Sequence, residues 1–305
     1  MFTVNDYIRF ITDPERVIGK IERALYREKK QDELRKMLSD YDINRDRTSA
    51  SDNGLYPLFC ELASREEKVF TNFRRNSFYN EILEHVTKKQ GKQYLNSIDW
   101  KFTEDDWNEF LKNDNYGNPR TVEYLIEDKK RKFSPTTIRY VKILGDVLKI
   151  FNTEKITSIS EIGIGYGGES RIILSYIKNV KKYNLIDLPE VIKLADRYLS
   201  SFSMEIYEKA NFIDGTSLDY KMESDFVISN YAFSELSRTI QDLYLEKIIL
   251  CSKAGYILWN DISYRTLDGY SVEELLSLIP GSYVVEENPA IFDGNKLILY
   301  SNNEI

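Results

Sequence analysis

The residues best suited to chemistry lie in one short segment, Ser160-Glu161-Ile162-Gly163-Ile164-Gly165-Tyr166-Gly167-Gly168-Glu169. Its glycines, including Gly163, Gly165 and Gly167, let the backbone turn tightly and approach a ligand where a side chain would clash. The spacing Gly163-x-Gly165-x-x-Gly168 also fits a dinucleotide fingerprint. A tight strand-to-helix turn without any ligand is a third interpretation. The segment therefore predicts a ligand-binding turn and leaves the ligand open.

Two carboxylates help to choose between the ligands. Glu161 precedes the first glycine on the strand itself, where its charge suits the ammonium group of a methionine moiety and serves no purpose for a pyrophosphate. Asp187 ends the next strand, predicted over 183–187, where a carboxylate can accept hydrogen bonds from both hydroxyls of a ribose. Capping of the helix that starts at Pro189 is the alternative role for Asp187. Together they favour an adenosine that carries an amino acid, although Asp187 alone would serve NAD equally well.

Further polar residues follow the third and fourth predicted strands. Asp214 either contacts an adenine or forms an Asp-Gly turn. Asn230 and Tyr231 come at the carboxyl end of the fourth strand, which is the edge where ligands bind in parallel α/β sheets. Alternatively, Asn230 forms an ordinary turn and Tyr231 only packs against its neighbours.

The elements that must position these residues begin near Thr153, where short apolar runs alternate with helical patterns. Such alternation is typical of a parallel sheet with crossover helices. Strands are predicted at 158–163, 183–187, about 204–208, 225–229, 255–260, 282–286 and 296–301. Helices are predicted near 168–178, 189–201, 238–252 and 271–279. The loop between the last two strands is too short for a crossover helix, so this pair is predicted to form an antiparallel hairpin.

The first part of the chain is predicted to be mostly helical. Helices are expected over 13–41, 58–73, 77–94 and 103–112, with a polar loop at 46–54. A further helix starts at Ser134 and Pro135 and carries an apolar stripe. The basic run 129–132 is interpreted as a solvated helix face. These patterns predict a helical, acceptor-binding region over 1–133 and a catalytic domain over 134–305.

Composition excludes several classes of function. The net charge is −7 and the pI is about 5.1, which argues against a nucleic-acid partner. No run is long and apolar enough for a membrane helix. The single histidine excludes a metal centre built on histidines, and the two cysteines, far apart, indicate a reduced, cytoplasmic setting. The stripe on 13–41 serves either packing within the chain or a homodimer contact.

Four segments together resemble a family of sugar O-methyltransferases from bacterial surface-glycan gene clusters. They are GIGYGGESRI, YNLIDLPEV, SNYAFSEL and GYILWN, and the similarity covers roughly residues 115–301. The resemblance implies an α/β, Rossmann-like class I methyltransferase domain, with a seven-stranded, mostly parallel sheet and a C-terminal antiparallel hairpin, behind a helical N-terminal region. It also implies S-adenosylmethionine as methyl donor and a glycan or sugar-nucleotide hydroxyl as acceptor, so that the expected partner is a small-molecule or glycan acceptor. The predicted donor-binding residues are Glu161, Gly163, Gly165, Gly167, Asp187, Leu188, Asp214, Asn230 and Tyr231.

Methyl transfer to an alcohol needs alignment of the acceptor and a group that takes its proton. Glu235, after the fourth strand, is the first candidate base, and Asp261, after the fifth, is the second. His85 lies in a predicted amphipathic helix, which favours a surface or packing role. The predicted substrate-binding residues are Arg139, Tyr140 and Tyr244. No metal is predicted, because Asn260 stands where adjacent acids would be expected.

Two other functions remain open from the sequence. A nicotinamide-dependent sugar-nucleotide oxidoreductase shares the glycine spacing but disagrees with the closing hairpin at 282–301. A non-catalytic, methyltransferase-like binding protein would keep the glycines and Asp187 and lack turnover. Titration with S-adenosylmethionine against NAD separates the first alternative, and donor binding without turnover would favour the second.

Overall fold

The computed structural model describes residues 49, 55–291, 294–302 and 305. The helix expected over 13–41, with its dimer contact, and nearly all of the loop 46–54 lie outside the described residues. The helices are α3 (Leu55–Arg65), α4 (Glu67–Phe70), α5 (Ser77–Ile82), α6 (Lys88–Ser97), α7 (Glu104–Leu111), α8 (Pro135–Ile150), α9 (Gly168–Tyr176), α10 (Pro189–Ser200), α11 (Met204–Tyr207), α12 (Arg238–Lys247), α13 (Ile262–Thr266) and α14 (Val272–Leu278). The strands are β1 (Val122–Ile126), β2 (Lys129–Phe133), β3 (Ser158–Ile162), β4 (Lys182–Asp187), β5 (Ala210–Asp214), β6 (Ser224–Asn230), β7 (Ser252–Trp259), β8 (Tyr283–Glu286) and β9 (Lys296–Ser301).

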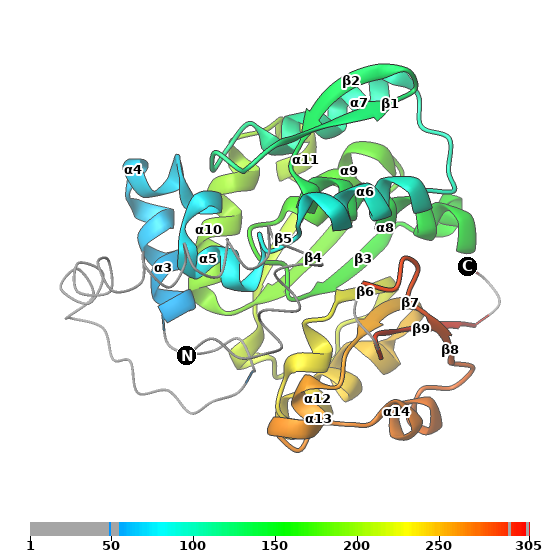
Figure 1. The fold of residues 1–305 in the computed structure, drawn as a ribbon. Helices are drawn as coiled ribbons and strands as arrows, with labels where there is room; N and C mark the ends of the chain where they lie inside the picture. The colour runs from blue at the N-terminus through cyan, green and yellow to red at the C-terminus, as the bar shows by residue number, and fades with distance from the viewer. Residues whose placement is uncertain (1–48, 50–54, 292–293, 303–304) are drawn as a thin grey trace, which may run out of the picture.

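A seven-stranded sheet forms the centre of the molecule (Figure 1). Its order is β5-β4-β3-β6-β7-β9-β8. The pairs from β5 to β7 are parallel, whereas β9 is antiparallel to both β7 and β8. The expected hairpin and α/β class are confirmed. A dinucleotide-binding sheet continues outward with its sixth strand, but here β9 is inserted between β7 and β8.

The two faces of the sheet bury separate apolar cores, because side chains alternate along each strand. Phe226 and Ile228 of β6 belong to the first core, with α8, α9 and α10, and Val227 belongs to the second, with α12 and α14. In Figure 1, α12 and α14 lie across the sheet from α8 and α9. The first core also includes Phe59 of α3 and Trp107 of α7, so the described part of the N-terminal region packs directly on the sheet domain. The boundary at 133/134 stays a prediction.

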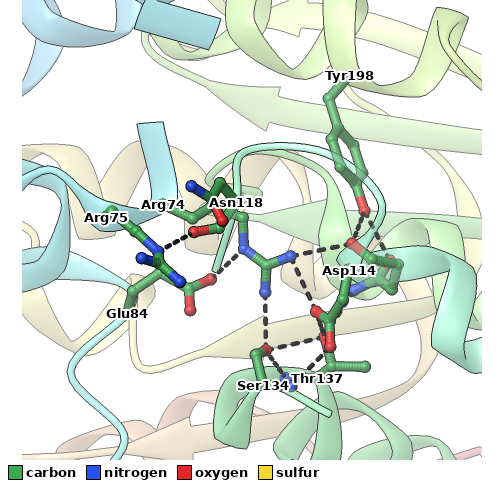
Figure 2. A network of polar contacts seen from close by, with 9 residues as sticks. Arg74, Arg75, Glu84, Asp114, Asn118, Ser134, Thr137 and Tyr198 are labelled. Atoms are coloured by element: carbon green, nitrogen blue, oxygen red, sulfur yellow. Dashed lines mark hydrogen bonds and ion pairs between the residues drawn. The ribbon is translucent and has the colours of Figure 1, made fainter. Parts of the chain in front are cut away.

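A buried arginine fixes the start of α8, the helix that carries Arg139 (Figure 2). Arg74 Nη2 donates to Ser134 Oγ at 2.8 Å, and its Nη1 donates to Asp114 Oδ1 at 2.9 Å. Asp114 in turn accepts from Ser134 N at 2.6 Å, and Ser134 Oγ caps the helix by accepting from Thr137 N at 3.1 Å. The predicted cap is therefore confirmed, and the network ties it to segments far away in the sequence.

Four expectations for local structure were wrong, and one helix was missed. The helix expected over 58–73 is divided into α3 and α4. The basic run 129–132 is strand β2, paired antiparallel with β1, and not a helix face. The single helix over 77–94 is two helices, because Thr87 forms a capping box with Gln90 and starts α6, which leaves His85 in the exposed connection. The strand expected at 204–208 is helix α11, and the third strand is β5. Helix α13 was not expected.

Candidate functional site

The predicted glycine turn follows β3 and takes backbone conformations that side chains rarely adopt. Gly163, Gly165 and Gly167 have φ values of +79°, +54° and +83°. A Cβ atom added at Gly163 would lie 1.9 Å from Cβ of Ala232. The turn therefore needs glycine for its conformation at all three positions, and at Gly163 also for a close approach of the segment after β6.

Asp187 lies at the carboxyl end of β4 and is hydrogen-bonded to this turn. Its Oδ2 accepts from Gly165 N at 3.1 Å, and its Oδ1 accepts from Leu188 N at 2.8 Å. Burial raises the pKa of Asp187 to about 6, although these backbone N–H groups oppose the rise. The side chain is still partly exposed. A carboxylate whose ionisation is made less favourable by burial is therefore accessible beside the glycine turn.

A cluster of buried polar side chains from three elements lies next to the turn. Asn230, at the end of β6, donates from Nδ2 to Glu169 Oε2 at 2.9 Å. Arg139 of α8 is close enough to Glu169 for its charge to favour the ionised carboxyl, although this effect does not outweigh burial. Within the described residues, Arg139 Nε, Glu169 Oε1 and Asn230 Oδ1 have no hydrogen-bond partner. Buried polar atoms without partners are rare and costly, so this donor and these two acceptors are suited to a polar ligand.

The two glutamates of the turn segment are both buried. Burial, only partly opposed by Arg139 and Asn230, raises the pKa of Glu169 to about 7. Burial first, and then the charge of Glu169, raises the pKa of Glu161 well above its ordinary range, while Tyr183 donates a 2.8 Å hydrogen bond to Glu161 Oε2. One oxygen of Glu161 thus accepts from a protein hydroxyl, whereas Glu169 Oε1 is buried without a hydrogen-bond partner among the described residues. In the sequence Glu169 stands only as the last residue of the glycine segment, with no local signal for this role.

Asp214 and Tyr244 lie at the other end of the candidate site. Asp214 is aligned with Asp187 on the adjacent strand, but its Oδ1 accepts from the backbone N and the hydroxyl of Thr216 at 2.8 and 2.6 Å. Asp214 thus forms hydrogen bonds within the turn that follows it, which was one of its two predicted roles. Tyr244 is buried, and a Cβ atom added at Gly215 would lie 2.0 Å from its hydroxyl, which places Tyr244 beside the ends of β4 and β5.

The two candidate bases lie around the carboxyl end of β7. Glu235 Oε1 accepts from Asn260 Nδ2 at 3.0 Å, and Asp261 Oδ1 accepts from Trp259 Nε1 at 3.2 Å. Both are partly exposed. Both lie at the same rim, where these bonds join Asp261 to the last residue of β7 and Glu235 to the residue that follows it. In the described part of the chain, no group of three or more His, Cys, Asp or Glu side chains is arranged to hold a metal.

Tyr231 and Tyr140 belong to the same region as Arg139. Tyr140 is buried in α8 beside Arg139, whose guanidinium lies 5.5 Å from its ring centre. Tyr231 donates a short hydrogen bond to Glu287, a residue that was not among the predicted site residues. Nothing in the local pattern around Glu287 could have identified it, because its partner follows β6, 56 residues earlier in the chain.

No family model matches the chain. A non-reducing polyketide synthase from Penicillium brasilianum is 24% identical over 151 residues, which are 45% of this chain and 6% of the synthase. Among solved structures, the mitomycin 7-O-methyltransferase MmcR has a TM-score of 0.40 at 13% identity, covering 54% of both chains. Human N-acetylserotonin methyltransferase in complex with SAM has a TM-score of 0.37 at 16% identity, covering 54% of this chain and 55% of that one.

The chain thus spans about half the length of these solved structures and a small fraction of the synthase. At such identities and TM-scores the likeness concerns the fold, and it carries no argument about activity. Among the described residues, no helix is both long and apolar enough to cross a membrane.

Proposed function

We propose that this protein is an S-adenosylmethionine-dependent O-methyltransferase. The observation that carries the proposal is the set of unpartnered buried atoms beside the glycine turn: one cationic donor, Arg139 Nε, and two acceptors, Glu169 Oε1 and Asn230 Oδ1. An α-amino acid has a carboxylate for the donor and an ammonium group for the acceptors. The methionine end of the donor would therefore satisfy all three atoms, since its charges match theirs.

The adenosine end has a matching surface in this proposal. Asp187 would accept hydrogen bonds from the ribose hydroxyls, and Tyr244 and Asp214 would lie toward the base. The turn from Gly163 to Gly167 would contact the ligand through its backbone, with Leu188 and Tyr231 at its borders. Glu161 would act indirectly, because Tyr183 already occupies its Oε2.

A nicotinamide dinucleotide fits these residues poorly. Its pyrophosphate would meet the buried carboxyl of Glu169, and like charges at short range in a buried site repel strongly. The insertion of β9 between β7 and β8 also differs from the strand order of the dinucleotide-binding fold. Both observations favour S-adenosylmethionine over NAD.

The acceptor in this proposal is a hydroxyl of a small molecule, with a sugar or glycan precursor as the class indicated by the sequence resemblance. Glu235 and Asp261 are candidate bases at the rim, and the region before residue 134 is the candidate acceptor-binding part. The enzyme's own task is alignment and exclusion of water, because the sulfonium donor is already activated.

Calorimetric titration of the full chain with S-adenosylmethionine and with NAD tests the proposal. We expect micromolar or tighter binding of the first and none of the second. Arg139→Met and Asp187→Ala should each weaken donor binding at least about tenfold, since each removes a charge-assisted hydrogen bond worth roughly 1.5–3 kcal/mol. Arg120→Met, at an exposed arginine, is the control. Binding of NAD, or equal donor binding in all variants, would contradict the proposal.

A further inference from the structure

Tyr231 has a backbone conformation that is unusual for a large side chain. Its φ is +68°, in the left-handed region, where non-glycine residues persist only when the surrounding structure holds them. Two hydrogen bonds do so: Tyr231 N donates to Leu258 O at 3.1 Å, and Ser234 Oγ donates to Tyr231 O at 2.6 Å. Strain of this kind is concentrated at functional sites. In this backbone conformation the Tyr231 hydroxyl reaches Glu287.

Glu287 is a buried carboxyl that accepts hydrogen bonds from two neutral donors among the described residues. It lies between β8 and β9 and is 3% exposed. Its Oε1 accepts from the Tyr231 hydroxyl, and its Oε2 accepts from Asn295 Nδ2 at 2.9 Å. No lysine or arginine of the described residues forms an ion pair with it. Because Glu287 Oε1 holds the Tyr231 hydroxyl directly, a proton that leaves this hydroxyl has a carboxylate oxygen in place to receive it.

The same hydroxyl is connected to the donor site. Tyr231 directly follows Asn230, whose side chain binds Glu169. Tyr94 of α6 lies beside both Tyr231 and Arg139, and burial raises the pKa of Tyr94 to about 12 although the charge of Arg139 opposes the rise. The Tyr231 hydroxyl and the proposed methionine pocket therefore belong to one continuous polar cluster.

We propose that Tyr231 and Glu287 are the pair that removes the proton of the acceptor hydroxyl. This inference rests on the proposed function and replaces Glu235 as the base. The acceptor oxygen forms a bond to the methyl carbon as the carbon–sulfur bond breaks and leaves a neutral thioether. The acceptor proton moves to the Tyr231 oxygen while the phenolic proton moves to Glu287. The products are a methyl ether, a neutral phenol and a protonated Glu287.

The hydrogen bonds at Tyr231 leave a place for the acceptor. Asn295 Nδ2 reaches the Tyr231 oxygen at 3.3 Å, longer than an ordinary bond to oxygen, and a hydroxyl donor can take this position. Burial first, and then the neighbouring Tyr94 and Glu287, raises the pKa of Tyr231 well above its ordinary range, so the phenol conducts the proton without becoming a phenolate. The pair suits an alcohol or phenol and gives no advantage with an ionised carboxylate or phosphate.

The test compares Tyr231→Phe and Glu287→Gln with matched changes on β8, Tyr283→Phe and Glu286→Gln, whose side chains are exposed. Donor affinity is measured by calorimetry with S-adenosylmethionine. Methyl transfer is measured as S-adenosylhomocysteine released with catechol or an alkyl glucoside as the hydroxyl probe. We expect a fall in kcat of about 100-fold or more in the first two variants, donor affinity within about twofold of the native protein, and no change in the two controls.

The outcomes separate the two proposals. If the native protein binds no donor, the proposed function fails. If it binds donor and the first two variants turn over normally, or if only Glu235→Gln loses turnover, the Tyr231–Glu287 pair is overturned. Bound donor with no transfer to either hydroxyl probe also counts against it. Should a variant lose its fold by circular dichroism, the native enzyme decides: two proton transfers through the pair require a solvent deuterium effect on kcat, and its absence overturns the pair.

Discussion

Replacing Glu169 by glutamine should stabilise the unliganded protein at alkaline pH and weaken donor binding. Glutamine keeps the shape of the side chain and can still accept the 2.9 Å hydrogen bond from Asn230. It removes a charge that is 2% exposed. Burial raises the pKa of Glu169 from its ordinary value of 4.5 to about 7, so ionisation in the folded state is unfavourable.

The size of the effect follows from that difference in pKa. At 1.36 kcal/mol for each pKa unit, it corresponds to roughly 3 kcal/mol. Because the folded state holds the proton that the unfolded chain has already released, stability falls as pH rises from about 4.5 to about 7 and is then constant. Between pH 5 and pH 8 the native protein should lose about 2–3 kcal/mol from this group. Glu161 is linked to Glu169, so its own pKa should fall in the variant.

Urea unfolding at pH 5 and pH 8 measures this change. Glu169→Gln should exceed the native protein in unfolding free energy by about 2–3 kcal/mol at pH 8 and by less than about 1 kcal/mol at pH 5. Glu208→Gln, at an exposed position, should show no such difference. Calorimetry should show donor binding weakened about tenfold or more, since the ammonium group loses its charged partner. A variant that is equally destabilised at both pH values, or that binds donor like the native protein, would refute the reasoning.

Two further substitutions test the fold around the site. Gly163→Ala should lower the free energy of unfolding by more than about 2 kcal/mol in urea, because φ is +79° and the new Cβ would lie 1.9 Å from Ala232 Cβ. Gly294 has a φ of +88° and no atom within 4 Å of an added Cβ, so Gly294→Ala should lower the free energy of unfolding by only about 1 kcal/mol. Equal losses would exclude the close approach as the cause. Asp225 accepts a 2.8 Å hydrogen bond from Lys253, and such bonds outweigh burial and lower its pKa. Asp225→Ala should cost roughly 1–3 kcal/mol at pH 7, and this difference should begin to shrink below about pH 4, where the unfolded carboxyl takes up its proton, and keep shrinking toward the lower folded-state pKa. A constant difference down to pH 2 would contradict that account.

Local patterns were sufficient for the features that depend on neighbours in the chain. The glycine turn was predicted because its conformation must be adopted by residues without a Cβ atom. The cap at Ser134 and the alternation of strands and helices from 158 onward follow from short-range hydrogen bonding and periodicity. The closing hairpin followed from the length of one loop.

The small hairpin β1–β2 shows where local patterns fail. Its two turn residues, Glu127 and Asp128, have φ values of +48° and +61°, where the recognisable signal would be Asn-Gly. Its second strand is a run of basic residues. Lys130 pairs with Glu123 across the hairpin, and Lys129 pairs with Glu104 of α7. The acidic residues of other elements therefore compensate the charges of β2. This segment forms a strand, although its own composition indicates a solvated helix.

The chemistry of the proposed site was decided by the tertiary structure. The sequence marked Arg139 and Asn230 separately, but only folding brings α8, α9 and β6 together and removes water from Glu169. That loss of water is what raises the pKa of Glu169 to about 7 and leaves polar atoms without partners. Tyr231 and Glu287 meet for the same reason, because the chain after β8 packs against the end of β6. A sequence states which side chains are present, and burial determines their charge and their reactivity.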